Sequence, residues 1–289
     1  MVERGYRVTI IDDLSTGNVS NVKSLLDNGK ADLIKGSVTD FTLLKRQFEG
    51  SQYIFHLAAL SSVPKSIDDP GSAHEINATG TLNVLIAARD CGVKKVIFAS
   101  SAAVYGDAPG VVKSEDMIPA PLSPYAVSKL AAEYYCGIFE KIYGIATVSL
   151  RYFNVYGPRQ DPDSPYAAVI PLFMRMVMDG KAPVVFGDGE QSRDFIFVKD
   201  AVEANINAAD SDATGVFNLG NSKKVTINEL ARLVIEISGN TALKPVYREP
   251  RPGDIRHSFA DIQKAGAFGF KPEYSLSEGL RETWDALRP

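Results

Sequence analysis

The first half of the chain alternates short apolar runs with longer stretches of helical composition. The apolar runs occupy residues 7–11, 31–34, 53–56, 95–100 and 146–151. Helical stretches lie around 43–48, before the stop signal Cys91-Gly92, from Tyr125 onward, and at 276–287 near the end of the chain. This alternation predicts a parallel, doubly wound α/β sheet. The runs lack strict apolar–polar alternation, which favours strands buried on both faces.

The second half of the chain is richer in turn-forming residues. Gly, Pro and Asp gather in segments 157–165, 187–190 and 249–253. We therefore expect one domain at 1–155 and a smaller one at 156–289. Residues 194–198 and 216–219 still read as strands, so the segment 194–220 is expected to return to the first domain.

Composition and charge narrow the class of function. Lys and Arg number 31 against 35 Asp and Glu, so the net charge of −4 offers no basic surface for nucleic acid or an anionic membrane. Two cysteines, Cys91 and Cys136, and three scattered histidines predict neither a disulfide framework nor a metal site. No apolar run reaches membrane-spanning length and no signal peptide opens the chain, so we expect a cytoplasmic protein with no membrane partner.

The stretch Tyr125-Ala-Val-Ser-Lys129 carries the first candidate chemistry. Ser123 and Pro124 are suited to begin a helix there, as N-cap and first-turn residue. Positions four residues apart share one helix face, so the Lys129 ammonium would lie one turn from the Tyr125 phenol. A nearby positive charge favours the phenolate and brings the phenol closer to the pKa of a useful general base. A surface Tyr and Lys on an amphipathic helix would give the same spacing, so the motif needs support from the rest of the chain.

Asp12 and Asp13 lie at the end of an early strand. In dinucleotide-binding folds a carboxylate in this position holds the adenosine ribose, about 20 residues after a glycine-rich loop, and disfavours the 2′-phosphate of NADP. A turn-forming Asp-Asp pair is the alternative interpretation. No Gly-x-Gly-x-x-Gly loop precedes Asp12, and residues 2–6 resemble the tail of a helix that ends at Gly5. Because that loop would cradle the pyrophosphate, we expect a gap in the sheet and weak or absent NAD binding.

Taken together, these features resemble the extended short-chain dehydrogenase/reductase family. Within it the chain is most similar to UDP-hexose 4-epimerases, and above all to the branch acting on UDP-N-acetylglucosamine. The segments that carry the resemblance are 56–59, 98–106, 125–129, 151–157, 187–195 and 251–254. It implies a Rossmann-like fold without its first strand, an NAD-binding domain at 1–155 and a nucleotide-sugar-binding domain at 156–289.

The resemblance also implies roles for individual residues. The catalytic positions are Ser101, Tyr125 and Lys129, with Ser100 as an alternative to Ser101. Positions implied for NAD are Asp12, Asp13, Ser37, Val38, Leu57, Ala58, Ala59, Asn77, Ser100, Tyr125, Lys129 and Tyr152. Positions implied for the UDP-sugar are Ser61, Ser101, Asn154, Ala168, Val169, Phe186, Arg193, Arg251, Asp254 and Ser258. Ser37 departs from the pattern, since many relatives have an Asp there that contacts the adenine.

The implied reaction is inversion at the sugar C4. Tyr125 as a phenolate would take the proton of the 4-hydroxyl while hydride leaves C4 for NAD⁺. Lys129 would lower the pKa of Tyr125 and bind the nicotinamide ribose, and Ser101 would hydrogen-bond the reacting oxygen. The 4-keto sugar would turn over and take the hydride back on its other face, while Arg193 and Arg251 hold the diphosphate through paired donors.

Relatives with the same fold run other reactions. The 4,6-dehydratases usually carry an acidic pair directly after the catalytic Ser or Thr, and the decarboxylases carry a Glu there. This chain has Ala102 and Ala103, which cannot move a proton, so both reactions rank below epimerisation. A catalytically idle protein that binds a nucleotide sugar or the cofactor is a further alternative, against which the intact Ser101, Tyr125 and Lys129 argue.

The family resemblance also implies a sugar preference and a quaternary structure. Ser258 stands where relatives that favour plain hexoses have a bulky Tyr, and a small residue there leaves room for a 2-acetamido group. We therefore expect interconversion of UDP-GlcNAc and UDP-GalNAc, with UDP-glucose and UDP-galactose as weaker substrates. Family members commonly form dimers through two long helices, here those ending near Cys91 and starting at Tyr125. The apolar positions that could serve that contact or the core are Leu130, Ala131, Tyr134 and Phe139.

Overall fold

The computed structural model describes residues 1–162, 167–250 and 256–288, and the chain divides into two compact units. The first unit comprises 1–100, 122–150 and 208–216, and the second comprises 101–121, 151–207 and 217–289. The sequence predicted an NAD-binding domain at 1–155 and a nucleotide-sugar-binding domain at 156–289. This assignment of one ligand to each domain stays a prediction.

The first unit contains the strands expected from the apolar runs. They are β1 (Val8–Asp12), β2 (Ala31–Lys35), β3 (Tyr53–His56), β4 (Lys95–Ser101) and β6 (Ala146–Tyr152), and the last residues of β4 and β6 fall in the second unit. Each begins and ends within one residue of its predicted bounds. The helices are α1 (Lys23–Asp27), α2 (Phe41–Phe48), α3 (Val63–Asp68), α4 (Pro70–His74), α5 (Gly80–Asp90) and α6 (Pro124–Tyr143).

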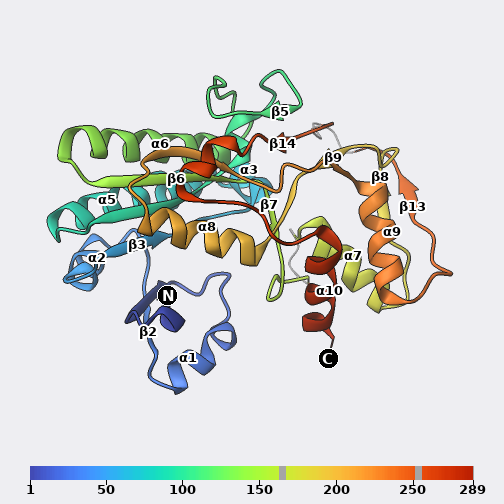
Figure 1. Ribbon diagram of the computed structural model, residues 1–289, viewed down its shortest axis with the longest axis horizontal. Helices are drawn as coiled ribbons and strands as arrows, with labels where there is room; N and C mark the ends of the chain where they lie inside the picture. Colours follow the sequence, from blue (N-terminus) through green and yellow to red (C-terminus); the bar gives the residue numbers. More distant parts are fainter. Residues whose placement is uncertain (163–166, 251–255, 289) are drawn as a thin grey trace. The chain divides into compact units, whose positions relative to one another are not determined.

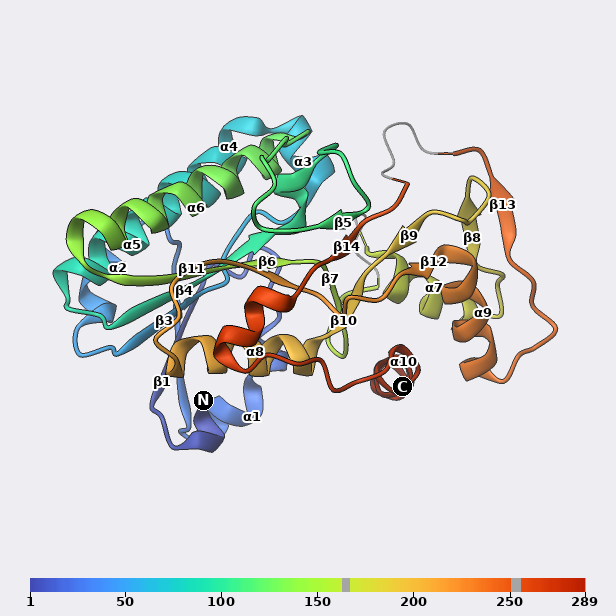
Figure 2. The same cartoon turned by 45° about the horizontal axis from the view of Figure 1, so that its top comes forward.

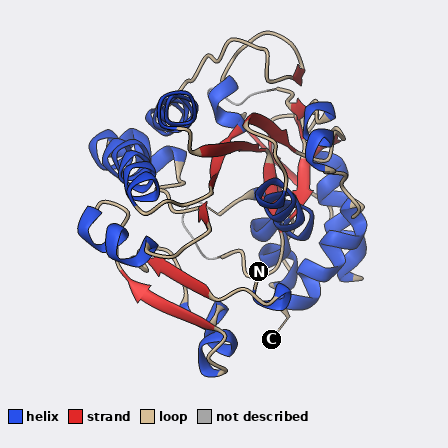
Figure 3. Ribbon diagram, turned by 60° about the vertical axis from the view of Figure 1, so that its left-hand side comes forward, coloured by secondary structure: helices blue, strands red, loops and turns tan. Residues whose placement is uncertain are grey.

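The sheet of the first unit is interrupted, as the sequence predicted. β1 pairs with β2 in parallel, from Val8 opposite Ala31 to Asp12 opposite Lys35, and these two strands form a sheet of their own. The larger sheet has the order β11-β6-β4-β3, with β11 at Gly215–Leu219, so β3 is an edge strand. Figure 3 shows the β1–β2 pair lying apart from the larger sheet. The doubly wound parallel α/β class is confirmed, with a break between β1 and β3.

Two long helices cover the larger sheet of the first unit. α5 and α6 contact each other and run side by side over the sheet (Figure 2). Phe98 and Val96 of β4, Leu85 of α5 and Cys136 of α6 are almost completely buried, and Val96, Phe98 and Cys136 share one core cluster with Leu85. Each large apolar side chain buried in this way stabilises the fold by about 1.5–3 kcal/mol. This packing fixes α6, the helix that carries Tyr125 and Lys129, against the end of β4.

The stretch expected to form one long helix before Cys91 is broken into several pieces. α3 ends at Asp68, Asp69 caps the next helix by accepting the N–H of Ser72, and Pro70 starts α4. Proline removes a helical N–H donor and clashes with the preceding turn, so a continuous helix cannot pass this point. A π-helical turn at Glu75–Thr79 then leads into α5.

The second unit packs helices around short strands. Its strands are β5 (Val112–Lys113), β7 (Asn154–Tyr156), β8 (Val184–Phe186), β9 (Ser192–Arg193), β10 (Phe195–Phe197), β12 (Val225–Thr226), β13 (Val246–Arg248) and β14 (Phe259–Ala260). Its helices are α7 (Val169–Met178), most of α8 (Val198–Asp210), α9 (Ile227–Ser238) and α10 (Leu276–Leu287). Figure 1 shows α7, α9 and α10, which contribute buried side chains such as Phe173, Leu230 and Trp284 to one core.

Two strands were expected to belong with the main sheet, and they have different partners. β11 lies next to β6, whereas β10 pairs with β7 in a separate two-stranded sheet. The carbonyl of Asp194 accepts both the backbone N–H of Asn154 at 3.1 Å and its side-chain amide at 2.9 Å. These two bonds fasten the start of β10 beside β7.

None of the helices in the described part of the chain has the length and apolar character needed to cross a membrane.

Candidate active site

Helix α6 begins as the sequence predicted and places Tyr125 in its first turn. The Ser123 hydroxyl accepts the N–H of Ala126 at 3.2 Å, and Pro124 occupies the first helical position. The backbone N–H of Tyr125 donates to the Ser66 hydroxyl at 3.1 Å, which ties the helix start to α3. Tyr125 is half-buried, and the Lys129 Nζ lies 5.9 Å from the centre of its ring.

The Lys129 ammonium is held at the end of β4. It is only 3% exposed and donates a hydrogen bond to the carbonyl of Ala99 at 2.8 Å, 4.9 Å from the centre of the Phe98 ring. Burial lowers the pKa of Lys129 to about 8, although the charge of Glu133 acts in the opposite direction. The group therefore remains mostly protonated at neutral pH and provides a cation one turn from the Tyr125 phenol.

His56 lies at the end of β3 in the same buried region. Its Nε2 is 2.9 Å from the Thr81 hydroxyl, and its ring packs on Phe98 with centroids 5.5 Å apart. Burial, with a smaller contribution from Lys129, lowers the pKa of His56 to about 3, so the imidazole is neutral at physiological pH. His56 therefore adds no second positive charge beside Lys129.

The two adjacent serines at the end of β4 have different partners. The Ser100 hydroxyl donates to the Glu133 carboxylate at 2.5 Å, and both residues are buried. The Ser101 hydroxyl accepts the N–H of Ala103 at 3.1 Å, which leaves its own proton available for donation. This difference favours Ser101 over Ser100 as the group that binds the reacting oxygen.

Asn77 connects the loop after β3 to α6. Its side-chain oxygen accepts the N–H of Leu60 at 2.8 Å, and its amide nitrogen donates to the Leu60 carbonyl at 3.1 Å and to Ser128 at 3.0 Å. Asn77 is almost completely buried, and these bonds hold the loop that carries Leu57, Ala58 and Ala59. Its proposed place near the nicotinamide stays a prediction, whereas its contacts give it a structural role.

The acidic strand end lies where the sequence placed it. Asp12 ends β1, and its carboxylate accepts the N–H of Leu14 at 2.7 Å. A Cβ on Gly17 would lie 3.0 Å from the same carboxylate, so the chain curls closely around it. Asp13 accepts the N–H of Ser15 at 2.9 Å, and the hydrogen bonds from Ser15 lower the pKa of Asp13.

The residues at the end of β2 complete this edge of the β1–β2 sheet. The backbone N–H of Gly36 donates to the Asp12 carbonyl at 3.0 Å. The Ser37 hydroxyl bonds to the Thr39 hydroxyl at 2.9 Å, and Val38 is buried. Asp12, Asp13, Ser37 and Val38 therefore lie at or just after the carboxyl ends of the paired strands β1 and β2.

Several residues predicted to bind the UDP-sugar gather around Ser192–Asp194 in the second unit. Asn154 is bonded to the Asp194 carbonyl, Arg193 Nη1 donates to the Ser192 carbonyl at 2.9 Å, and the N–H of Ser258 donates to the same carbonyl at 3.3 Å. Arg251 and Asp254 lie outside the described residues. The other UDP-sugar positions are Ser61, in the exposed loop before α3, and Ala168 and Val169, at the start of α7. Tyr152, predicted for NAD, donates its hydroxyl to Asn205 at 2.8 Å.

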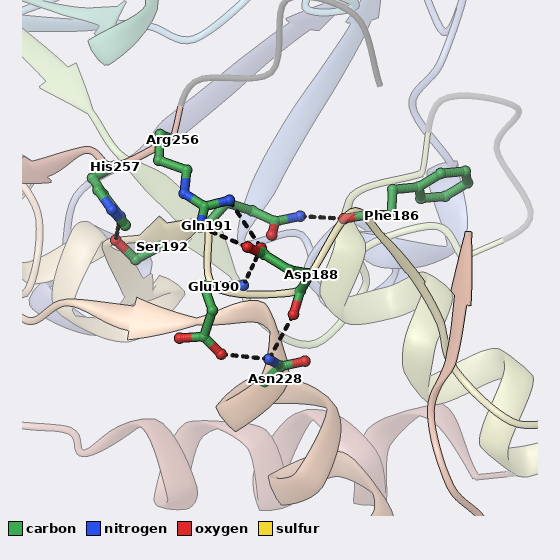
Figure 4. A network of polar contacts seen from close by, with 8 residues as sticks. All are labelled: Phe186, Asp188, Glu190, Gln191, Ser192, Asn228, Arg256 and His257. Atoms are coloured by element: carbon green, nitrogen blue, oxygen red, sulfur yellow. Dashed lines mark hydrogen bonds and ion pairs between the residues drawn. The ribbon is translucent and has the colours of Figure 1, made fainter. Parts of the chain in front are cut away.

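A polar network holds the segment next to Ser258 (Figure 4). Arg256 donates two hydrogen bonds to Asp188, at 2.9 and 2.7 Å, and the Ser192 hydroxyl lies 2.9 Å from His257 Nδ1. The Asn228 amide donates to the Asp188 carbonyl and to Glu190. Gln191 donates to the carbonyl of Phe186 at 2.7 Å, which fixes that predicted substrate residue at the end of β8.

Sequence reasoning missed two buried polar residues that hold the second unit together. The Asp194 carboxylate accepts backbone N–H groups from Asn221, Ser222 and Ala260 at 2.7 to 3.0 Å. Asn218 accepts the Tyr105 hydroxyl at 2.6 Å and donates to the carbonyls of Lys113 and Asp261. Their partners lie far away in the sequence, so no local pattern could have identified these roles.

The described residues fit NAD at its two ends. Asp12 offers a carboxylate for the adenosine ribose, and Lys129 with Tyr125 offers donors on the nicotinamide side. Gly17 allows the close approach of backbone around the Asp12 carboxylate.

Comparison with known proteins identifies the family. Residues 1–220 match the family model described as "NAD dependent epimerase/dehydratase family". The UDP-glucose 4-epimerase of Mycolicibacterium smegmatis is 36% identical over 289 residues, covering 98% of this chain and 91% of that protein. The chain therefore belongs to the NAD dependent epimerase/dehydratase family, which is the extended short-chain dehydrogenase/reductase family that its motifs resemble.

Solved structures agree with this assignment. A UDP-N-acetylglucosamine 4-epimerase from Methanobrevibacter ruminantium M1, in complex with UDP-N-acetylmuramic acid, is 43% identical with a TM-score of 0.93, covering 96% of this chain and 89% of that one. A UDP-glucose 4-epimerase from Thermotoga maritima with UDP-glucose is 39% identical with a TM-score of 0.93, covering 99% and 92%. The Rossmann-like fold predicted from the sequence is thereby confirmed.

Proposed function

We propose that this protein is a UDP-sugar 4-epimerase that inverts C4 through a transient 4-keto sugar. The observation that carries the proposal is the Lys129 ammonium, buried at the end of β4 one turn from the Tyr125 phenol. A phenol beside a buried cation is suited to take and return one proton. Membership of an epimerase/dehydratase family supports the same chemistry.

The chain's own residues bind, orient and move the proton. Tyr125 takes the proton of the sugar 4-hydroxyl, Lys129 favours its phenolate, and Ser101 donates a hydrogen bond to the reacting oxygen. NAD, when bound, supplies the hydride acceptor, with Asp12 on its adenosine ribose and Lys129 on its nicotinamide ribose. Arg193 anchors the uridine diphosphate, so that the sugar turns over while the nucleotide stays in place.

The residues after Ser101 support epimerisation over dehydration or decarboxylation. Ala102 and Ala103 begin a short 3₁₀ helix, and Ala103 contributes only its backbone N–H to Ser101. Neither side chain can act as the additional acid or base that those reactions require. An idle binding protein would not need a buried Lys129 beside Tyr125.

We propose UDP-GlcNAc and UDP-GalNAc as the preferred substrates, with UDP-glucose and UDP-galactose as weaker ones. Ser258 supports this preference, because it is small, half-buried and held through its N–H by the Ser192 carbonyl. A backbone fixed in this way would present a small side chain at the position where bulky residues exclude a 2-acetamido group.

The test is a coupled assay for the epimerised sugar. UDP-GlcNAc and UDP-glucose are each incubated with the protein and a range of NAD⁺ concentrations, and the products are separated by ion-pair chromatography. UDP-GalNAc formation that depends on Tyr125 supports the proposal. Binding of UDP-GlcNAc without turnover at saturating NAD⁺ favours the idle binding protein. Loss of water from either sugar favours dehydration, and loss of carbon dioxide from UDP-glucuronate, tested in parallel, favours decarboxylation.

We also propose a homodimer and a cytoplasmic location. The exposed apolar side chains of α6 support the dimer, since Val127, Tyr134, Ile138 and Ile142 recur at helical spacing along one side. Among the apolar positions expected to serve either the dimer contact or the core, Phe139 packs in the core and Tyr134 is exposed. Cell fractionation tests the location.

A further inference from the structure

Glu133 is a buried acidic residue to which the proposed reaction gives no role. It lies on α6 one turn after Lys129 and two turns after Tyr125, and it is only 3% exposed. A buried carboxylate is costly unless it is hydrogen-bonded or paired with a charge. Such groups gather at functional sites, where they tune the charge of their neighbours.

Two hydrogen bonds join consecutive residues of β4 to α6. The Lys129 ammonium donates to the carbonyl of Ala99, and the Ser100 hydroxyl donates to the Glu133 carboxylate. Ser101 follows directly in the chain. The Ser100–Glu133 contact therefore fixes the strand end immediately before Ser101 against the helix that carries Tyr125.

The surroundings of Lys129 make the charge of Glu133 important. His56 faces it from β3 and is neutral, because burial lowers the His56 pKa to about 3. Cys136 faces it from α6 as a neutral thiol, because burial raises the Cys136 pKa to about 12. Glu133, one helical turn after Lys129, is the acidic neighbour whose charge raises the pKa of Lys129 against the effect of burial.

We propose that Glu133 is a positioning residue of the site, which holds the end of β4 through Ser100 and supplies the buried negative charge that keeps Lys129 protonated beside Tyr125. The proposal rests on the proposed function in one respect, namely that the Lys129 cation favours the Tyr125 phenolate during the reaction. The coupling between Glu133 and Lys129 is a property of the chain itself and needs neither sugar nor NAD.

The test is an NMR titration of the Lys129 ammonium in the whole chain labelled with ¹³C and ¹⁵N lysine, with the signal assigned by Lys129→Arg. Glu133→Gln keeps the size of the side chain and an acceptor oxygen for Ser100 but removes the charge. We expect the Lys129 midpoint to fall by a measurable fraction of a pH unit, because a nearby opposite charge favours the protonated ammonium. Ser100→Ala keeps the charge and removes the bond, so it should lower the melting temperature and move the midpoint less. An unchanged midpoint in Glu133→Gln overturns the proposal.

Two further variants keep the test decisive. Glu140→Gln, a half-buried carboxylate farther along the same helix, is the matched control and should leave the Lys129 midpoint in place. Should Glu133→Gln fail to fold, the double variant Ser100→Ala/Glu133→Met removes both polar partners together, a replacement that buried pairs often tolerate. Its Lys129 midpoint should fall in the same way, and an unchanged value there would overturn the proposal equally.

Activity separates this inference from the proposed function. Glu133→Gln should shift the alkaline limb of the kcat profile to lower pH and leave KM for the UDP-sugar nearly unchanged. A purely structural role would lower stability without moving that limb. If the Lys129 midpoint falls but the unmodified protein makes no epimerised sugar at saturating NAD⁺, the inference stands and the proposed function fails.

Discussion

At the scale of single residues, the buried Lys129 makes the turnover rate depend on pH. Its pKa is lowered by burial from 10.5 to about 8, so its charge is lost at a pH where an exposed lysine keeps its proton. We expect kcat to fall above about pH 8, because Tyr125 then loses the neighbouring cation that favours its phenolate. Initial rates at saturating substrate over a pH series check this, and a plateau that extends to about pH 10 would count against the assignment.

The same shift predicts a change of stability with pH. The unfolded chain keeps the Lys129 proton up to about pH 10.5, whereas the folded chain releases it near pH 8. Between these values the unfolded state binds more protons, so the free energy of unfolding should rise with pH. The measurement is urea unfolding of the unmodified protein and of Lys129→Met across this window. The free energy of unfolding of the unmodified protein minus that of Lys129→Met should rise as pH increases across this window. A constant value of this difference would contradict the expectation.

Tyr125→Phe removes the proposed general base and changes little else. The backbone N–H of residue 125 still reaches Ser66, so the start of α6 should be preserved. We expect turnover to fall by about 10²- to 10⁴-fold, the usual contribution of a positioned proton-transfer group. Tyr135→Phe, a partly exposed tyrosine on the same helix, is the control and should retain its activity. Equal rates in the two variants would remove Tyr125 from the mechanism.

Ser258→Tyr tests the proposed sugar preference. The N–H of Ser258 is held by the Ser192 carbonyl, so a larger side chain there should narrow the space around the sugar without unfolding the segment. We expect kcat/KM for UDP-GlcNAc to fall roughly 10- to 200-fold while that for UDP-glucose changes little, the range seen when a pocket changes size by small groups. Because the two substrates share the nucleotide, UDP-glucose serves as the internal control. An equal loss on both would show that Ser258 does not discriminate between them.

At the scale of elements, α6 combines a buried face that carries the site with an exposed apolar face. Tyr134 is 61% and Ile142 is 67% exposed, whereas Cys136 is completely covered. Tyr134→Glu combined with Ile138→Glu places charges in the proposed dimer contact, where burying them is unfavourable. Light scattering should show the mass falling from that of a dimer to that of a monomer. Val202→Glu, at an exposed apolar position on α8, should leave the mass unchanged, and a monomeric unmodified protein would refute the dimer.

Which elements could be predicted depends on how local their causes are. The strand at residues 53–56 was predicted with its observed ends, since a short apolar run determines it locally. The break before α5 was missed, although Asp69 and Pro70 signalled it, because the apolar pattern continues past them. Tyr125, Lys129 and Ser101 were found through motif spacing, whereas Glu133 escaped notice because its partner Ser100 lies 33 residues away.

At the scale of the whole molecule, two separate sheets of the fold hold the groups expected at the two ends of NAD. β1 and β2 form a pair of their own that ends at Asp12, and β3 is the outer strand of the other sheet. Lys129 is bonded to the end of β4 in that second sheet, one helical turn from Tyr125. Asp12 is therefore available for the adenosine ribose, and Lys129 with Tyr125 for the nicotinamide side.

Isothermal titration of NAD⁺ tests the adenosine end of this site. The Asp12 carboxylate is the group suited to the adenosine ribose hydroxyls, so Asp12→Ala should weaken NAD⁺ binding. We expect the affinity to fall roughly tenfold or more, the usual cost of losing hydrogen bonds to a charged group. UDP is the control ligand, because its predicted contacts at Asn154 and Arg193 lie in the second unit. An unchanged NAD⁺ affinity in Asp12→Ala would remove Asp12 from the cofactor site, whereas loss of UDP binding as well would point to a folding defect.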